Sequence, residues 1–379
     1  MRSSATPTSG SFTRPEGARW RALADVRWGL LLAALALAGI GLATVHSASA
    51  ELAIDYLPRQ AAWVGIGLAA CAAAFAVDHR LLLAFAVPLY LVSVLLLALV
   101  LVVGHEAGGA QGWLRVAGVG FQPSELAKLA TALLLARMLA RVGRGHLTGR
   151  DTARALAVVA LPMLLTAVEP DLGGAAMFLP VVFGMLFVCG LPWRLVAAAA
   201  LLALVAGGVA WGLFMKPYQK ERVLTFLDAG RDPRGAGYQA RQSKIAVGSG
   251  ELTGKGYMQG SQSQLRFLPA RHTDFILAVL AEERGFLGVA TVLGLYGVFL
   301  ATGGAVAMRA RDRSGLLLVA GLLSMIGFHV VYNSAMVIGL VPITGIPLPF
   351  LSYGGSFMVI CFAATGLILG VDYRRYVNR

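Results

Sequence analysis

Long apolar stretches, separated by short polar segments, follow one another along nearly the whole chain. A helix that crosses a membrane needs about 20 mostly apolar residues. Ten stretches are candidates for such helices, and they are residues 28–48, 60–77, 81–103, 123–140, 155–169, 172–190, 193–215, 274–307, 315–340 and 350–371. The pattern therefore predicts an all-α integral membrane protein with ten transmembrane helices.

The polar segments divide the chain into three parts. Residues 1–27 are basic and have no apolar core followed by a cleavage site, so we predict a cytoplasmic tail and no signal peptide. Residues 28–371 form the ten-span domain, in which residues 216–272 are a large extracellular loop between helices 7 and 8. Residues 372–379 form a second cytoplasmic tail.

The composition and the positions of the arginines fit this scheme. Only 13% of the residues are charged, against about 25% in soluble domains. Basic residues in short loops stay on the cytoplasmic side; with the N-terminus inside, eighteen arginines lie in cytoplasmic segments, and the short outer loops hold Arg59 and Arg115. We predict that both termini are cytoplasmic, and that the excess positive charge meets membrane lipids and no nucleic acid. The three cysteines lie in apolar stretches without paired spacing, which predicts small core residues.

The first unusual outer segment is residues 104–130. Pro123 suits the first position of a helix, and Glu125 and Lys128, three residues apart, lie on one face of its first turns. The two charges either form an ion pair at the helix mouth or line a wet cavity, where charged groups in membranes usually lie; we favour the cavity. Trp113 is either an interfacial anchor or a flat platform for a sugar or lipid headgroup.

Two further outer segments are also unlike simple turns. Residues 216–272 carry ten basic residues against four acidic ones, with many glycines. This composition predicts a diphosphate cradle, although a flexible solvated loop would have a similar one. Residues 341–359 are apolar but contain three prolines, so they cannot form a regular helix. Non-helical backbone at membrane depth must be buried or line a cavity, and we predict a re-entrant loop beside Asp274.

Four ionisable residues lie in the eighth predicted span. Asp274 stands where the helix is expected to begin, and it either caps the helix or faces outward as a reactive group. Glu282 and Glu283 follow ~12 Å deeper, at 1.5 Å per residue. We predict Arg284 or Lys128 as their counter-ions, joining the fourth and eighth spans.

Two other pairs of polar residues have structural explanations. Glu169 and Asp171 lie in a short turn, in which Pro170 ends one helix and Asp171 caps the next. His329 and Asn333 are four residues apart on one helix face, which predicts interhelical hydrogen bonds rather than catalysis.

Four sequence blocks together resemble one family, the shape, elongation, division and sporulation (SEDS) proteins, which include the RodA and FtsW membrane glycosyltransferases. The likeness spans about residues 28–375 and is closer to RodA, because the basic residue common before the last block in division proteins is missing. In order, the blocks are Gly112-Trp113 with Gln122-Pro123-Ser124-Glu125 and Lys128, then Pro170-Asp171-Leu172-Gly173, then Gly254-Lys255-Gly256 to Leu268-Pro269 with His272-Thr273-Asp274-Phe275, and last Pro347-Leu348-Pro349-Phe350 with Ser352-Tyr353-Gly354-Gly355-Ser356.

This resemblance implies a peptidoglycan glycosyltransferase of the bacterial inner membrane. Its substrate would be lipid II, the undecaprenyl-diphosphate-linked disaccharide-pentapeptide, polymerised at the outer face during cell elongation. The resemblance implies Asp274 as the general base. Gly112, Glu169 and Arg284 depart from the family's usual residues. The residues expected to bind substrate are Trp113, Glu125, Lys128, Lys255, Arg266, Arg271 and Ser356.

The implied reaction replaces an α-linked diphosphate with a β-1,4 glycoside and therefore inverts the donor carbon. One carboxylate base suffices if the charge of the leaving diphosphate is neutralised. Lys255, Arg266 and Arg271 are the candidates for this neutralisation, and a divalent cation such as Mg²⁺ is a further one.

Two other functions would use some of the same features. A lipid II flippase would need an internal inverted repeat and charges that serve both leaflets, and a scaffold would not need Asp274. The resemblance also implies a partner, a class B penicillin-binding protein transpeptidase, for which the apolar faces of the eighth and ninth spans offer a docking surface.

Overall fold

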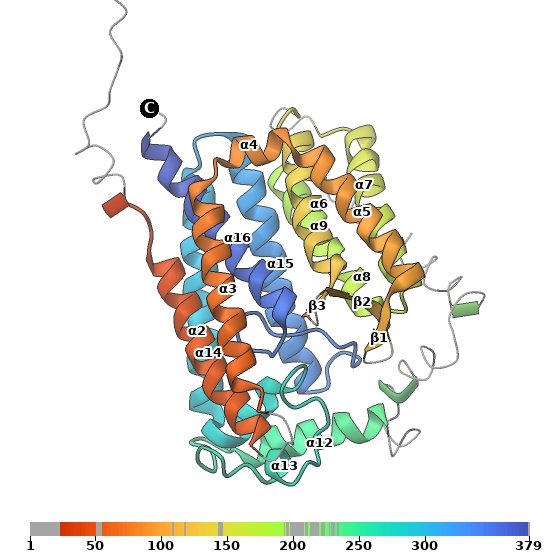
Figure 1. Cartoon of the computed structure of the whole chain (residues 1–379), viewed down its shortest axis with the longest axis vertical. Coiled ribbons are helices and arrows are strands. Elements are labelled where there is room, and N and C mark those ends of the chain that lie inside the picture. Colours follow the sequence, from red (N-terminus) through yellow and green to blue (C-terminus); the bar gives the residue numbers. More distant parts are fainter. Residues whose placement is uncertain are drawn as a thin grey trace, which may run out of the picture.

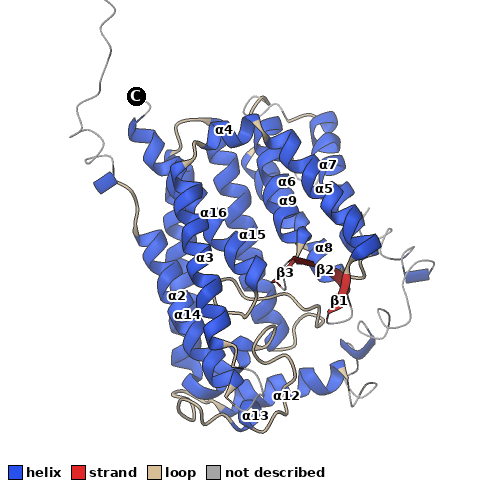
Figure 2. Ribbon diagram, viewed as in Figure 1, coloured by secondary structure: helices blue, strands red, loops and turns tan. Residues whose placement is uncertain are grey.

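In the computed structural model the chain is predominantly helical, and its long helices run side by side between two ends of the molecule (Figures 1 and 2). The structure describes residues 23–50, 55–107, 110–116, 119–142, 147–192 and 235–377, with isolated residues between 193 and 234. The seventh predicted span, 193–215, and residues 216–234 of the large loop therefore lie almost wholly outside the described residues. The described helices are α2 (Gly29–Ser49), α3 (Leu57–Ala76), α4 (His79–Ala84), α5 (Ala86–Val103), α6 (Pro123–Leu139), α7 (Gly149–Val168), α8 (Leu172–Ala176), α9 (Phe178–Val188), α12 (Ala236–Ser249), α13 (Ser261–Gln264), α14 (Ile276–Arg309), α15 (Arg313–Val337) and α16 (Gly355–Val377).

Within the described residues, seven helices are long and apolar enough to cross a membrane, namely α2, α3, α5, α7, α14, α15 and α16. The helix α6 has 17 residues, and α8 and α9 together form a shorter apolar segment. Nine of the ten predicted stretches thus coincide with helices, although the third is divided into α4 and α5 and the sixth into α8 and α9. The chain is a multi-pass membrane protein.

The helix α16 forms the centre of the bundle. In its most apolar stretch 89% of the residues are buried inside the protein, against 17% for α3. The two helices pack so closely that a Cβ on Gly366 would collide with the carbonyl oxygen of Cys71. Small residues allow such close approach between membrane helices, which lipid itself does not drive together. All three cysteines are buried, unbridged residues.

The two ends of the bundle differ in character. Both ends of the described chain lie at one of them, where the backbone N–H of Arg27 donates to the Asp372 carboxylate (3.0 Å). We name this end the terminus face. The opposite end, named the loop face, holds the strands, α12, α13 and the loop of residues 341–354 (Figure 1).

The all-α prediction is incomplete, because three short strands form a small sheet on the loop face. They are β1 (His105–Ala107), β2 (Ala110–Val116) and β3 (Val119–Phe121), paired antiparallel in that order. Within the sheet, Trp113 lies opposite His105 and Leu114 opposite Phe121. Strand pairing satisfies the backbone groups of a segment that runs close to the membrane, and runs of three to seven residues are too short to stand out beside apolar spans.

A break near the start of α14 changes the interpretation of its charges. Gly285 has φ 63° and ψ −162°, a conformation that residues other than glycine adopt only with strain. The large loop packs into this break, where the N–H groups of Phe286 and Leu287 donate to the carbonyl oxygens of Glu251 and Leu252 (2.8 and 3.1 Å). The acidic residues just before Gly285 are therefore enclosed by the protein's own loop and not by lipid.

Of the predicted counter-ions of these buried glutamates, Lys128 is wrong, because it pairs with Glu125, whereas the charge of Arg284 does act on Glu283. The carboxylate of Glu282 is fully buried and accepts from the Lys255 ammonium (2.7 Å) and from backbone N–H groups of α13. Glu283 accepts from a serine hydroxyl of α2. The buried charges thus hold the large loop and α2 to α14, and do not join the fourth and eighth spans.

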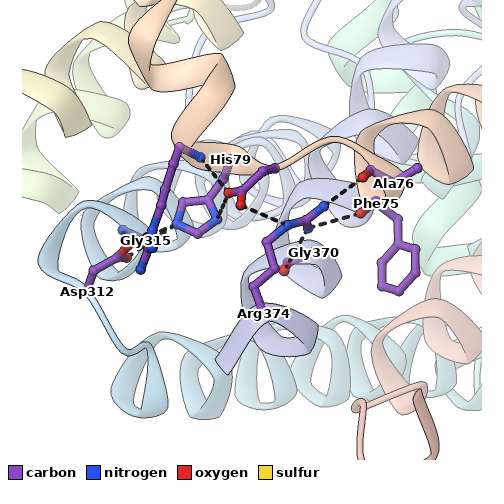
Figure 3. Close-up of polar contacts among 9 residues, drawn as sticks. Phe75, Ala76, His79, Asp312, Gly315, Gly370 and Arg374 are labelled. Carbon is purple, nitrogen blue, oxygen red and sulfur yellow. Dashed lines mark hydrogen bonds and ion pairs between the residues drawn. The ribbon is translucent and has the colours of Figure 1, made fainter. Parts of the chain in front are cut away.

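A charged cluster closes the terminus face (Figure 3). The His79 ring lies between Asp78 and Asp312, with nitrogen–oxygen distances of 3.4 and 3.3 Å. Arg374 of α16 donates to two backbone carbonyl oxygens at the end of α3 (3.0 and 2.8 Å) and pairs with Asp78 (3.6 Å). The pKa of Asp312 lies well below its usual range, and the largest cause is the hydrogen bond between its carboxylate and the His79 ring. The terminus-face cluster is defined as Asp78, His79, Arg80, Asp312 and Arg374.

Candidate active site

Asp274 lies in a turn that precedes α14. The helix begins at Ile276, and its cap position is Phe275, which makes no side-chain capping bond. Of the two alternatives that the sequence left for Asp274, the structure therefore excludes the helix cap. Its backbone N–H donates to the carbonyl oxygen of Ala270 (3.1 Å), and the residue is partly exposed at the loop face.

The loop of residues 341–354 and α15 hold this turn in place. The Asn333 side chain of α15 donates to the carbonyl oxygen of Asp274 and to a carbonyl oxygen of the loop, both at 2.8 Å. The Ser352 hydroxyl donates to the carbonyl oxygen of the residue before Asp274 (2.6 Å). A Cβ on Gly345 would lie 3.6 Å from Asp274 Oδ2. As predicted, this loop is non-helical, its apolar residues are buried and it lies beside Asp274.

Glu125 and Lys128 form an ion pair of 2.8 Å inside the protein. Their exposed fractions are 4% and 0%, so neither side chain faces lipid. The ammonium lies 5.5 Å from the ring centroid of Phe357, against which His329 stacks. A buried ion pair is stabilising only when its remaining atoms are also satisfied, yet Glu125 Oε2 has no hydrogen-bond partner among the described residues. The pair is therefore buried but not fully satisfied by the described residues.

The first residues of α6 and α16 meet beside the small sheet. The Gln122 backbone N–H donates to Ser356 Oγ (3.1 Å), and the Gln122 side chain donates to Asp171 (3.3 Å). Trp113 of β2 covers Gly120, where a Cβ would lie 3.4 Å from the indole ring. Two of the predicted substrate-binding residues, Trp113 and Ser356, therefore lie near the start of α6.

Glu169 is a buried carboxylate without a partner. It lies in the turn after α7 with 1% exposure, and neither of its oxygens has a hydrogen-bond partner among the described residues. Burial, and then the negative charge of Asp171, raise the pKa of Glu169 to about 8. A Cβ on Gly112 would lie 3.2 Å from Glu169 Oε2. A buried carboxylate without a partner does not stabilise the fold. The mainly structural role that the sequence suggested for Glu169 therefore does not explain why its carboxylate is buried and unpaired.

The three basic candidates of the large loop differ in their surroundings. Lys255 pairs with Glu282, and Arg271 is 3% exposed with its Nε bonded to the carbonyl oxygen of Ala48 (2.6 Å). Both side chains thus tie the loop to neighbouring helices. Arg266 is exposed, with a backbone φ of 61°.

A cavity of about 390 Å³ lies between α2 and α14, next to the break in α14. Its polar lining includes Tyr257, Glu283 and Arg284. The Arg284 guanidinium lies 5.6 Å from the centroid of the Tyr257 ring. None of the lining residues belongs to the turn of Asp274 or to the loop of residues 341–354, so this cavity is separate from the candidate active site.

Gln60 and His272 also position the site, although the sequence analysis gave them no role. Gln60 is fully buried in α3, where it donates to the carbonyl oxygen of Ser352 (3.0 Å) and accepts from the N–H of Gly354 (3.4 Å). The His272 ring stacks on Tyr56 with centroids 4.6 Å apart, and burial, with the nearby Arg271 charge second, lowers the His272 pKa. A polar amide within an apolar span was the available signal for Gln60.

The sequence matches known proteins along most of its length. The model of the FtsW, RodA and SpoVE family, described as "Cell cycle protein", matches residues 28–377. Peptidoglycan glycosyltransferase MrdB of Escherichia coli (strain K12) is 39% identical over 347 residues, which cover 91% of this chain and 93% of the relative. A probable peptidoglycan glycosyltransferase FtsW of Geobacter sp. (strain M18) is 36% identical over 357 residues, covering 91% of this chain and 96% of the relative.

Solved structures share the fold as well. A chain solved in work on the structural coordination of polymerization and crosslinking by a peptidoglycan synthase complex superimposes with a TM-score of 0.80 at 39% identity, covering 93% of this chain and 98% of that one. The rod shape determining protein RodA of Thermus thermophilus gives a TM-score of 0.69 at 35% identity, with the same coverage of 93% and 98%. The likeness therefore extends to both sequence and fold.

Proposed function

The chain belongs to the FtsW, RodA and SpoVE family, and from this premise we propose that it is a RodA-type peptidoglycan glycosyltransferase that polymerises lipid II during cell elongation. One observation carries the proposal, namely the partly exposed Asp274 in a turn fixed by Asn333 and Ser352. A general base must be held within reach of the proton that it removes. The hydrogen bonds from Asn333 and Ser352 to backbone carbonyl oxygens of this turn hold Asp274 in one position.

In the proposed reaction the 4-hydroxyl oxygen of the acceptor sugar attacks C1 of the donor sugar. The bond between C1 and the diphosphate oxygen breaks, its electron pair leaves with the diphosphate, and Asp274 takes the hydroxyl proton. Inversion in a single displacement needs no second carboxylate as nucleophile, unlike a retaining glycosidase. Positive charge near the leaving diphosphate then lowers the barrier.

The remaining substrate contacts are part of the same proposal. Trp113, Glu125, Lys128 and Ser356 would bind the sugars or the headgroup, and the unpartnered Glu125 Oε2 supports this assignment. Among the diphosphate candidates, the exposed Arg266 is the best supported. Lys255 and Arg271 would act from within the contacts that already hold the loop.

We infer that the chain lies in the inner membrane of a bacterial cell with ten spans. The large loop, residues 216–272, would connect the seventh and eighth spans on the outer side, and the loop face would then be the outer face. Support comes from the distribution of arginines and from the contact between the two ends of the described chain at the terminus face.

A class B penicillin-binding protein is the partner that we propose. The similar chain from a peptidoglycan synthase complex supports an assembly of this kind, and α14 and α15 offer exposed apolar side chains for it. The most exposed are Met308, Phe286 and Leu287 on α14 and Val331 and Phe328 on α15. Co-purification with such a transpeptidase in mild detergent tests the pairing, and failure with both proteins folded would contradict it.

The decisive experiment offers lipid II to the purified chain, alone and with the transpeptidase, and measures glycan length. A parallel assay in sealed vesicles follows fluorescent lipid II across the membrane. Polymer formation supports the glycosyltransferase. Transfer across the membrane without polymer would instead identify a flippase, and neither activity from folded protein would identify a scaffold.

A further inference from the structure

The unpartnered Glu169 carboxylate requires an explanation that the catalytic proposal does not supply. In protein interiors, carboxylates are neutralised by protonation, paired with a cation or coordinated to a metal. Among the described residues, no donor lies within hydrogen-bond distance of either Glu169 oxygen, although the side chain is 1% exposed. The space around these oxygens is therefore polar, enclosed and unsatisfied.

A second carboxylate acts on the same space. Asp171 follows Glu169 by two residues, in the same turn between α7 and α8. The Asp171 side chain is fixed, because its Oδ1 accepts from the N–H of Gly174 (2.7 Å) and its Oδ2 from the Gln122 amide (3.3 Å). The buried Glu169 and the half-buried Asp171 carry like charges, which repel one another unless a cation or a proton lies between them.

The backbone opposite Glu169 is a glycine. Gly112 of β2 has no side chain, and a Cβ there would lie 3.2 Å from Glu169 Oε2 and 3.9 Å from the Gln122 amide nitrogen. The turn after α7, the start of α6 and β2 thus meet at the Glu169 carboxylate. Any residue larger than glycine at position 112 would crowd it.

From this geometry we propose that Glu169 and Asp171 together bind a hard divalent cation of the Mg²⁺ or Mn²⁺ type. Mg²⁺ takes oxygen ligands and is commonly held by one or two carboxylates, with water or substrate phosphate oxygens in the other positions. Two carboxylates therefore suffice, and no group of three or more His, Cys, Asp or Glu is required. The charge of such an ion balances the two carboxylates.

The position of this cation site connects it to Asp274. A Cβ on Gly173 would collide with Thr344 of the loop, and the next loop residue, Gly345, approaches Asp274 Oδ2. A cation held at Glu169 and Asp171 would lie beside the loop that fixes the general base, where it could neutralise a leaving diphosphate. That last step depends on the proposed function, whereas binding of the cation does not.

The test uses the full chain, purified in detergent and stripped with a chelator. Mn²⁺ is titrated while the free ion is followed by electron paramagnetic resonance, Mg²⁺ is added as competitor, and thermal unfolding is recorded with and without each ion. Glu169→Gln removes the charge at nearly constant shape, and Asp55→Asn, in an exposed turn at the start of α3, is the matched control for a lost negative charge. No substrate is present, so an inactive enzyme and an absent cation site give different results.

We expect one Mn²⁺ per chain, displaced by Mg²⁺, with a higher unfolding temperature in its presence. Glu169→Gln should weaken Mn²⁺ binding at least ~10-fold, the effect of losing a ligand or its support, and Asp55→Asn should bind like the wild type. In chelator, Glu169→Gln should unfold at a temperature no lower than that of the wild type, because no bond is lost.

Three results would overturn the proposal. One is a wild type that binds no Mn²⁺ up to millimolar concentration, which would make Glu169 a neutral acid. Another is unchanged Mn²⁺ binding by Glu169→Gln, which would place the ion elsewhere. The third is a Glu169→Gln chain that fails to fold in chelator, since the carboxylate would then have a structural partner.

Discussion

Buried charges gather at both ends of this protein. Every charged side chain of the terminus-face cluster has an ion-pair partner, although His79 Nδ1 makes no hydrogen bond, whereas some carboxylates at the loop face have no partner among the described residues. In the terminus-face cluster, His79 lies between two carboxylates, and Arg374 has both carbonyl and carboxylate partners. At the loop face, Glu169 has no partner among the described residues, and one oxygen of Glu125 has none. One helix, α16, runs from the loop face to the terminus face.

The difference separates a scaffold from a site. Buried polar groups normally find partners, because an unsatisfied one costs free energy without return in stability. The ion pairs at the terminus face therefore indicate a cluster that holds α3, α4, α15 and α16 together. Missing partners at the loop face indicate groups whose partners arrive with a ligand. A change of Asp274 at the loop face should reduce activity and spare stability, and changes at the terminus face should do the reverse.

The largest effect is expected for Asp274→Asn. Asparagine keeps the shape but cannot take the proton from the attacking hydroxyl, so the rate of polymerisation should fall by ~10²–10⁴. Single-turnover assays on lipid II measure the rate, and thermal unfolding should give the same midpoint as the wild type. Normal polymer from Asp274→Asn would refute the role of this residue.

Arg374→Ala should be the most destabilising change at the terminus face. It leaves two carbonyl oxygens at the end of α3 without their donor and removes the cation paired with the partly exposed Asp78, which costs on the order of 1–3 kcal/mol. The neighbouring Arg80→Ala is the control, because the half-exposed Arg80 pair with Asp312 is worth ~0–1 kcal/mol. Unfolding in detergent measures both, and equal effects would contradict the assignment of Arg374 as the central residue of the cluster.

The Glu125–Lys128 pair offers a sharper comparison within the loop face. Glu125→Gln or Lys128→Met alone leaves one buried charge unpaired, so each should cost more stability than the double variant. The coupling should be ~1–3 kcal/mol. Polymerisation should remain low in the stable double variant, because the pair is also expected to contact substrate. Full activity in the double variant would make the pair structural only.

Asp312→Asn should have the smallest effect, and one that depends on pH. Asparagine preserves the helix cap and loses the charge next to His79 and Arg80, worth at most about 1 kcal/mol. Because folding lowers the Asp312 pKa, the charge stabilises the fold above the ordinary pKa of aspartate. The advantage of the wild type over Asp312→Asn should be full at neutral pH, begin to fall near the ordinary aspartate pKa of about 4, and disappear only at the lowered pKa of the folded protein. An advantage that grows in acid would contradict this sign.

The sequence by itself determined the class of the protein, the positions of nine of its apolar stretches and the segments that could not be simple turns. These features depend on the free energy of transferring consecutive residues to lipid, and on local backbone chemistry such as proline in the loop of residues 341–354. The resemblance to a known family was also visible in local blocks. The site around Asp274 could be located in this way, whereas the chemical roles of its residues stay predictions.

Only the tertiary structure decided which charges meet. Glu282 pairs with Lys255, and Glu283 accepts from Ser47, because the large loop packs into the break of α14 at Gly285. The pattern of apolar residues along the chain does not indicate this contact. The same holds for Glu169, whose isolation depends on what the sheet, α6 and α8 place around it. Local pattern sets which segments enter the membrane, but the partner of a buried charge is set by packing between segments far apart in the chain, since the interaction depends on distance in space.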